Sequence, residues 1–122
     1  MSSVEQAANA NEAIRSLNHA TLSTSGHNVT DVYALLGELT QLGHRLEQTT
    51  GQLAGILEAR QRLDSLHLAT EDTRYNTASD AIDTALTALA IAARASERLA
   101  LDLQAAQTAL TWIRDPINTP RA

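Results

Sequence analysis

Two histidines in the middle of the chain lie three residues from an acidic side chain. The pairs are His44 with Glu47 and Asp64 with His67. Residues three apart share one face of an α-helix, so each pair offers two ligands to a metal ion. A metal centre in a helical bundle needs Glu and Glu-x-x-His ligands from several helices, and residues 76–114 contain no histidine. The sequence therefore favours solvated histidines and predicts no metal ligand and no cofactor.

Ser25, His27 and Asp31 have the side chains of a hydrolase triad. No G-x-S-x-G motif accompanies them, and the small polar residues around Gly26 are typical of a turn. Neither glycine-rich phosphate-binding motif occurs in the chain, and there is no cysteine to act as a nucleophile. We therefore expect no catalytic residue and a protein that is not an enzyme.

The composition points to helices. Hydrophobic residues make up 43% of the chain, yet Phe is absent and Trp occurs once, so Ala, Leu, Ile and Val supply nearly all of them. Ala and Leu are among the best helix formers. The only prolines, Pro116 and Pro120, lie at the C-terminal end, and no apolar alternation marks a strand. The prediction is a single all-α domain over residues 1–122.

Net charge limits the classes of partner. The chain carries a formal charge of -5, which repels nucleic-acid phosphates and anionic membrane surfaces. The longest apolar stretch, residues 85–93, is about half of the ~20 residues that a membrane-spanning helix needs. We expect a soluble, cytoplasmic protein that binds neither nucleic acid nor membrane.

Apolar spacing predicts a short helix over about residues 3–22. Its apolar face consists of Ala7, Ala10, Ile14, Leu17 and Thr21. The polar residues 23–28 then form a loop.

A second helix is predicted over about residues 29–69. Asn28 or Thr30, followed by Asp31, provides an acceptor and a negative charge for its first turn. Its apolar stripe has the heptad spacing of a helix that packs along another helix. The stripe comprises Val32, Leu35, Leu39, Leu42, Leu46, Thr49, Leu53, Ile56, Arg60 and Leu63.

A third helix is predicted over about residues 73–115, followed by a short tail at 116–122. Pro116 disfavours helix at the residue before it. The stripe of this helix comprises Tyr75, Ala78, Ile82, Ala85, Leu89, Ala92, Ser96, Leu99, Leu103, Ala106, Leu110 and Ile113.

The two long stripes predict an antiparallel, coiled-coil-like hairpin. If the chain turns back near residues 72 and 73, the numbers of facing residues add up to about 145. Leu46 then faces Leu99, and the hydroxyls of Thr49 and Ser96 face each other or bond back to their own helices. On the flanks this register pairs Glu47 with Arg98 and Arg62 with Asp83.

Gly51 and Gly55 have the small-xxx-small spacing that allows close approach of helices. The first helix is expected to pack on the half of the hairpin formed by residues 32–46 and 99–113. The other half is then exposed or binds a second subunit. The predicted fold is therefore three helices, with the shorter one packed on a long hairpin.

Ile91, Leu101 and Trp112 fall on positions of the third helix that face away from its stripe. They are either covered by the first helix or form a candidate partner interface, since Trp is enriched in interface hot spots. The turn region is acidic, with Asp64, Glu71, Asp72, Asp80 and Asp83. This acidic tip is either a solvated cap or a docking point for a basic partner.

The sequence thus favours a non-enzymatic protein that acts as a scaffold or adaptor and binds a protein partner or itself, most simply as a homo-oligomer. Two alternatives remain open. One is a helical bundle that binds a small ligand or metal with its glycines and His44 or His67. The other is a structural component of a phage or plasmid-encoded assembly.

Overall fold

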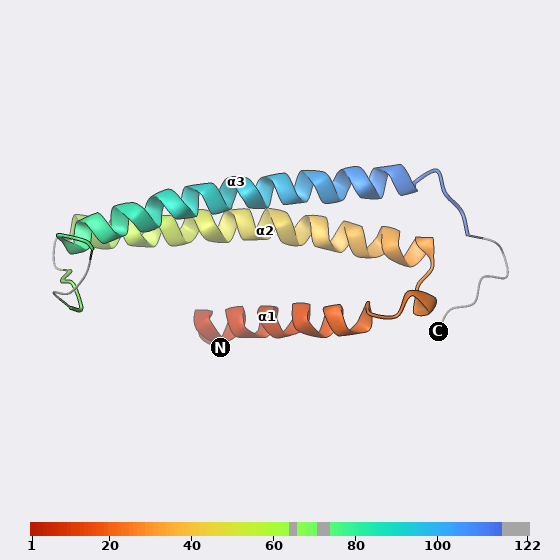
Figure 1. Cartoon of the computed structure of the whole chain (residues 1–122), viewed down its shortest axis with the longest axis horizontal. Coiled ribbons are helices and arrows are strands. Elements are labelled where there is room, and N and C mark those ends of the chain that lie inside the picture. Colours follow the sequence, from red (N-terminus) through yellow and green to blue (C-terminus); the bar gives the residue numbers. More distant parts are fainter. Residues whose placement is uncertain (64–65, 71–73, 116–122) are drawn as a thin grey trace.

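The computed structural model describes residues 1–63, 66–70 and 74–115, and the described part of the chain is helical without any strand. Helix α1 (Ser3–Ala20) is followed by a short 3₁₀ turn (Thr24–Gly26). The two long helices are α2 (Val29–Arg62) and α3 (Ala78–Leu110). They run antiparallel along almost their whole length and form one extended hairpin (Figure 1). The predicted all-α fold with a long antiparallel hairpin is confirmed.

Polar contacts at both ends of the hairpin show its register. Near the connected end, Gln61 Nε2 donates a hydrogen bond of 2.8 Å to Asp83 Oδ1. At the open end, the backbone amide of Val29 donates a bond of 3.1 Å to Asp115 Oδ1. The numbers of these facing residues agree with the predicted total of about 145.

The face of α2 that packs on α3 differs from the prediction. From residue 46 onwards the predicted stripe is exposed, and one set of buried and half-buried residues recurs at three- and four-residue steps, one position further along. They are Leu36, Thr40, Gly43, Glu47, Thr50, Ala54, Leu57 and Gln61. In the predicted stripe Leu53 is 46% exposed and Ile56 is 58% exposed. In this part of the helix, the face that packs on α3 is therefore rotated by about 100°, the turn of one residue, from the predicted orientation.

Small residues explain this rotation. A Cβ added at Gly43 would lie 3.0 Å from the Cβ and 3.2 Å from the Cα of Ala100, so the two backbones are in close contact there. By contrast, a Cβ added at Gly51 or Gly55 would meet nothing within 4 Å. The prediction that these two glycines allow the close approach is wrong, and Gly43 allows it instead.

The stripe of α3 follows the prediction up to Ser96 and then shifts. Ala100 and Gln107 pack towards α2 in place of Leu99 and Ala106, and Leu99 is left 47% exposed. The step from Ser96 to Ala100 is four residues where the heptad has three, which is a local break in the repeat. It places the small Ala100 opposite Gly43.

Capping explains where the helices begin. Of the two predicted acceptors, Asn28 caps α2, and together with Asp31 it forms a capping box, in which each backbone amide bonds to the other residue's side chain. The Thr77 hydroxyl accepts the amide of Asp80 at 3.1 Å, so α3 starts at Ala78 instead of near residue 73. The predicted turn at residues 70–73 lies mostly outside the described residues.

Both long helices end earlier than predicted, at Arg62 and Leu110 instead of near residues 69 and 115. The amide of Leu63 bonds to Arg60 O, and the amide of Thr111 bonds to Thr108 O. These tighter bonds satisfy carbonyls of the last turn, so each helix ends without continuing to the proline or the predicted turn.

Helix α1 runs opposite to α2 and lies alongside its N-terminal half in Figure 1. The sequence predicts that it packs on the hairpin, yet every Cα of α1 is more than 8 Å from every Cα of α2 and α3. Its apolar face is rich in alanine, and Ile14 and Leu17 are its only half-buried residues. This face buries too little surface to hold the helix tightly.

Candidate functional site

The hairpin has very little interior. Ala100 is the one buried hydrophobic residue among the described residues, and no large side chain there is fully buried. A core of this size leaves the leucines and isoleucines of the described residues half-buried or exposed. Candidate sites on this protein are therefore surfaces and not cavities.

The first candidate is the exposed leucine face of α2, which we call the α2 stripe. It consists of the apolar members of the stripe predicted from the sequence: Val32, Leu35, Leu39, Leu42, Leu46, Leu53, Ile56 and Leu63. Leu35, Leu39 and Leu42 are half-buried, whereas Leu46 and Leu63 are 42% and 63% exposed. The half of the stripe nearest the hairpin tip is thus the uncovered one.

Two polar residues, Thr49 and Arg60, interrupt the α2 stripe. The Thr49 hydroxyl donates a 3.0 Å bond to Arg45 O, and the Ser96 hydroxyl donates a 3.0 Å bond to Ala92 O. Both bond back to their own helices, and Thr49 is exposed, not opposite Ser96 in the interface. Arg60, the other polar member, is exposed and makes no ion pair with any described residue.

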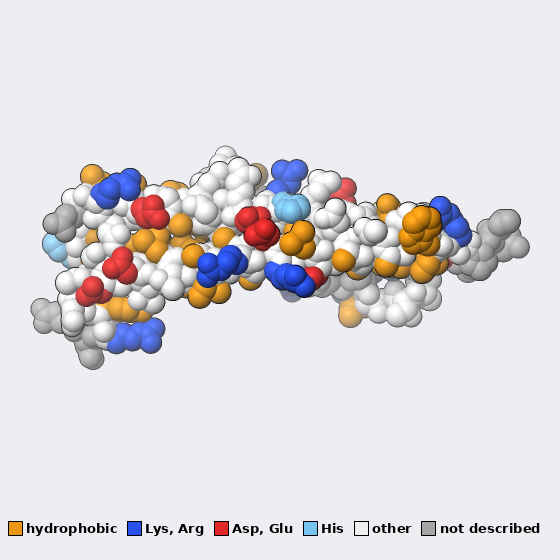
Figure 2. Space-filling model, turned by 90° about the horizontal axis from the view of Figure 1, so that it is seen from above, with side chains coloured by type: hydrophobic (Ala, Val, Ile, Leu, Met, Phe, Trp, Pro, Cys, Tyr) orange, Lys and Arg blue, Asp and Glu red, His pale blue; other side chains and the backbone are white. Residues whose placement is uncertain are grey.

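The second candidate comprises the three residues that the sequence predicts as a partner interface, which we call the α3 strip. Ile91, Leu101 and Trp112 are 56%, 47% and 85% exposed, and α1 does not cover them. Trp112 lies just beyond the end of α3, beside Ile113, which is 48% exposed. In Figure 2 hydrophobic side chains gather next to a basic side chain at this right-hand end of the hairpin.

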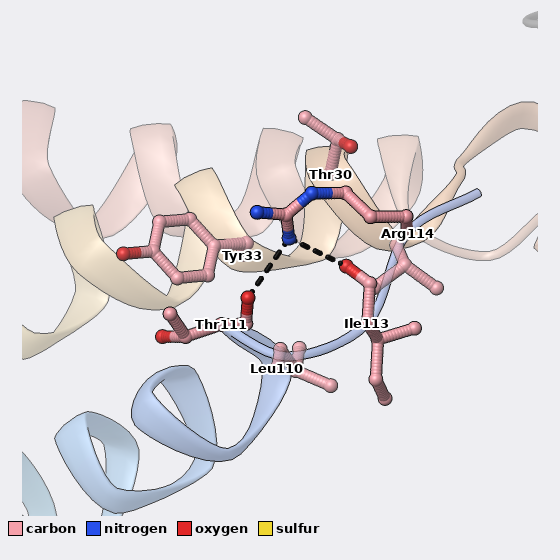
Figure 3. A pocket seen from close by; sticks show the side chains of 7 residues that line it. Thr30, Tyr33, Leu110, Thr111, Ile113 and Arg114 are labelled. Atoms are coloured by element: carbon pink, nitrogen blue, oxygen red, sulfur yellow. Dashed lines mark hydrogen bonds between the residues drawn. The ribbon is translucent and has the colours of Figure 1, made fainter.

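An open recess of about 340 Å³ lies between the first turn of α2 and the last turn of α3 (Figure 3). Its lining consists of Val29, Thr30, Tyr33, Leu110, Thr111, Ile113 and Arg114. Arg114 Nη1 donates bonds of 2.8 Å to Thr111 O and 3.0 Å to Ile113 O, so its guanidinium holds the turn that ends α3.

Asp115 closes the open end of the hairpin next to this recess. Its carboxylate accepts the amides of Val29 and Thr30, each at 3.1 Å, and the Thr30 hydroxyl at 3.2 Å. A carboxylate at a helix N-terminus satisfies unpaired amides and interacts favourably with the helix dipole. Sequence reasoning missed this cap because residue 115 is far from residue 29 along the chain.

Among the described residues, the histidines and the triad-like side chains lie apart or serve the local structure. His27 has a ring nitrogen 3.2 Å from Ser23 O, and Asp31 belongs to the capping box, so the triad-like residues stabilise the loop. His44 is exposed and Asp64 lies outside the described residues. In the part of the chain that the structure describes, His, Asp and Glu form no group of three that would hold a metal.

The predicted flank pairs are replaced by other contacts. Arg98 pairs with Asp102 on its own helix at 3.2 Å, not with Glu47. Asp83 accepts a bond from Gln61, the neighbour of Arg62. At the acidic tip, Asp80 and Asp83 are exposed, while the other three acidic residues lie outside the described ranges.

Comparison of the chain with protein-family models, with curated proteins and with solved structures found no match. None of the described helices contains an apolar stretch long enough to cross a bilayer.

Proposed function

We propose that this protein is a non-enzymatic helical interaction protein, a scaffold or adaptor that self-associates and docks on a protein partner through its uncovered apolar surfaces. One observation carries the proposal: the accessible surface is far too large for a protein of this mass. A compact protein of 13.1 kDa exposes about 6,400 Å², whereas this chain exposes 9379 Å².

This excess compares directly with known interface sizes. At about 3,000 Å², it is more than three times the roughly 800 Å² that each partner buries in an interface of standard size. Leu53, Ile56 and Leu99 are all about half exposed and contribute apolar area to it. Burial of apolar area is the main favourable term in folding and association, so a second protein surface would supply the core that the hairpin lacks.

The α3 strip supports docking of a partner. Trp112 is the only tryptophan, and at 85% exposure it contributes little to the fold of the single chain. Tryptophan is enriched among the residues that dominate binding energy in interfaces. The net charge of -5 disfavours nucleic acids and anionic membranes, so the proposed partner is a protein.

Two other functions are weaker proposals. A helical bundle that binds a small ligand would use the recess at Tyr33 and Arg114, since Gly51, Gly55 and His44 line no pocket there. A structural role in a phage or plasmid-encoded assembly is one form of the scaffold proposal and likewise requires an interface with another protein.

Measurement of the molar mass in solution by light scattering, over a wide concentration range, tests the proposal. We expect a dimer or larger oligomer, with a mass that falls on dilution. A mass of 13.1 kDa at all concentrations would contradict self-association. Elemental analysis of the same sample tests the metal alternative, which requires a stoichiometric metal.

A further inference from the structure

We propose that a second copy of the chain docks antiparallel on the half of the α2 stripe nearest the hairpin tip, with Leu53 facing the partner's Ile56. This inference rests on the proposed self-association and specifies its surface and geometry. We call this half, which comprises Leu46, Leu53, Ile56 and Leu63, the tip half of the stripe.

Helix α1 is too short to cover the tip half. At ~1.5 Å per residue, its 18 residues reach about 27 Å, while the stripe from Val32 to Leu63 extends about 47 Å. In Figure 1, α1 lies beside the N-terminal and middle parts of α2 and stops short of the part nearest the turn, where α3 is the only helix alongside.

Exposure along α2 has the same asymmetry. Leu35, Leu39 and Leu42 are half-buried, but exposure rises from 42% at Leu46 to 63% at Leu63. Helix α3 packs on the adjacent face, through Thr50, Ala54 and Leu57, and so does not reach this stripe. The tip half is therefore an apolar face, interrupted by Thr49 and Arg60, that neither α1 nor α3 covers in the described part of the chain.

Charge determines the direction of the docked copy. In a parallel pair, equivalent heptad positions face each other, and Arg60 would meet the partner's Arg60 inside the apolar seam. Two like charges at such a position destabilise the pair. In an antiparallel pair Arg60 faces the partner's Thr49, whose hydroxyl oxygen can accept a hydrogen bond from the guanidinium.

The antiparallel arrangement also fills every layer of the seam. When the tip halves overlap completely, Leu53 faces the partner's Ile56 and Leu46 faces the partner's Leu63. A stripe that matches itself in this way forms a closed two-fold dimer in which the same patch serves both subunits. Two hairpins joined through α2 form a four-helix arrangement around a shared apolar core.

The large accessible surface area of the chain favours a second copy over an unrelated protein as the occupant. The accessible surface is large because the single chain has almost no core: no large side chain among the described residues is fully buried. A surface that the chain needs in order to acquire a core must be covered whenever the protein is folded. A second copy is always available for this purpose, and a different protein is not.

Matched charge insertions test the docking surface. Leu53 and Leu101 are both leucines and are 46% and 47% exposed, but Leu53 belongs to the α2 stripe and Leu101 to the α3 strip. We expect Leu53→Asp to raise the dimer dissociation constant at least about 100-fold, because it buries two carboxylates near the two-fold axis. Leu101→Asp should leave that constant within about threefold of the wild-type value.

Spin labels test the direction without changing the stripe. The chain has no cysteine, so Gln41→Cys and Gln48→Cys place single labels on exposed positions of α2. Antiparallel overlap centred between residues 54 and 55 separates the two Gln48 labels by about 20 Å and the two Gln41 labels by about 40 Å along the axis. A parallel dimer would give nearly the same short distance for both sites and would overturn the inference.

The outcomes separate this inference from the broader proposal. If Leu101→Asp dissociates the oligomer and Leu53→Asp does not, the docking surface is wrong, but self-association stands. If the wild-type chain is monomeric at every concentration, self-association itself fails, and the docking inference fails with it. Circular dichroism of both aspartate variants shows whether the hairpin remains helical. The spin-label distances from Gln41→Cys and Gln48→Cys leave the stripe unchanged, so they do not depend on that result.

Discussion

Gly43 lies directly against Ala100, and a Cβ at position 43 would stand 3.0 Å from the Cβ of that alanine. The neighbouring atoms also include the backbone nitrogen of Ala100 at 3.3 Å, which cannot move without the helix. The pair thus keeps the two long helices close together. At this level a glycine of α2, and not a leucine, therefore lies against α3.

The contact between Gly43 and Ala100 leads to a comparison of two identical substitutions in one helix. The Cβ that Gly51→Ala adds would meet nothing within 4 Å. This substitution should raise the free energy of unfolding by about 0.5–1 kcal/mol, because alanine has the higher helix propensity. Gly43→Ala gains the same propensity but presses on the backbone of α3, so we expect no gain or a net loss. Urea denaturation followed by circular dichroism measures both. Equal stabilisation by the two substitutions would show that the helices are not in close contact at residue 43.

Gly43→Val should destabilise the hairpin clearly. The larger side chain forces the helices apart, and overpacking of this kind typically costs about 1–3 kcal/mol. The matched control is Gly51→Val, which adds no clash and should cost little or nothing, since valine is a slightly better helix former than glycine. The same denaturation experiment applies, and a smaller loss at position 43 than at position 51 would contradict the structure.

Asp115 joins the C-terminal end of the hairpin to the start of α2. Asp115→Ala removes the acceptor of the Val29 and Thr30 amides and should lower the free energy of unfolding by about 1 kcal/mol. Asp102→Ala is the control, because the exposed pair of Asp102 with Arg98 is worth at most about 1 kcal/mol and often nothing measurable. Amide hydrogen exchange at Val29 and Thr30 should quicken in the first variant only.

Trp112 serves as its own probe because it is the only tryptophan. In the isolated protein its fluorescence should be that of a solvated indole and should be quenched strongly by iodide, in keeping with 85% exposure. Trp112→Ala should change the stability of the chain by less than about 0.5 kcal/mol, as is usual for surface substitutions. It should weaken binding of a protein partner, measured by calorimetry. Blue-shifted, unquenched emission from a monomer would contradict the structure at this residue.

Removal of residues 1–21 tests the loose attachment of α1. Because no Cα of α1 comes within 8 Å of the long helices, the denaturation midpoint of the hairpin should change little. A loss of several kcal/mol would mean that α1 packs on the hairpin in solution as the sequence predicts. The truncated chain keeps Asn28, so the capping box of α2 remains intact as an internal control.

The sequence by itself determined the local structure of this protein. Heptad spacing predicted both long helices, Asn28 with Asp31 predicted the start of α2, and the two stripes predicted the register of the hairpin. These features depend on residues close together in the chain or on a simple repeat, so they can be read without the fold. The exposure of Ile91, Leu101 and Trp112 follows from the same periodicity, and their role in binding remains a proposal.

Only the tertiary structure decided which face of α2 meets α3. Adjacent stripes on a helix differ by one residue, or about 100°, and on α2 both the α2 stripe and the set that runs from Leu36 through Gly43 to Gln61 repeat with heptad spacing. The leucines favour burial, but the close contact of Gly43 with Ala100 is possible only on the other face. Since that contact and the Asp115 cap join residues more than fifty positions apart, neither leaves a mark in the local pattern. The same choice leaves the α2 stripe exposed and creates the surface to which we assign self-association.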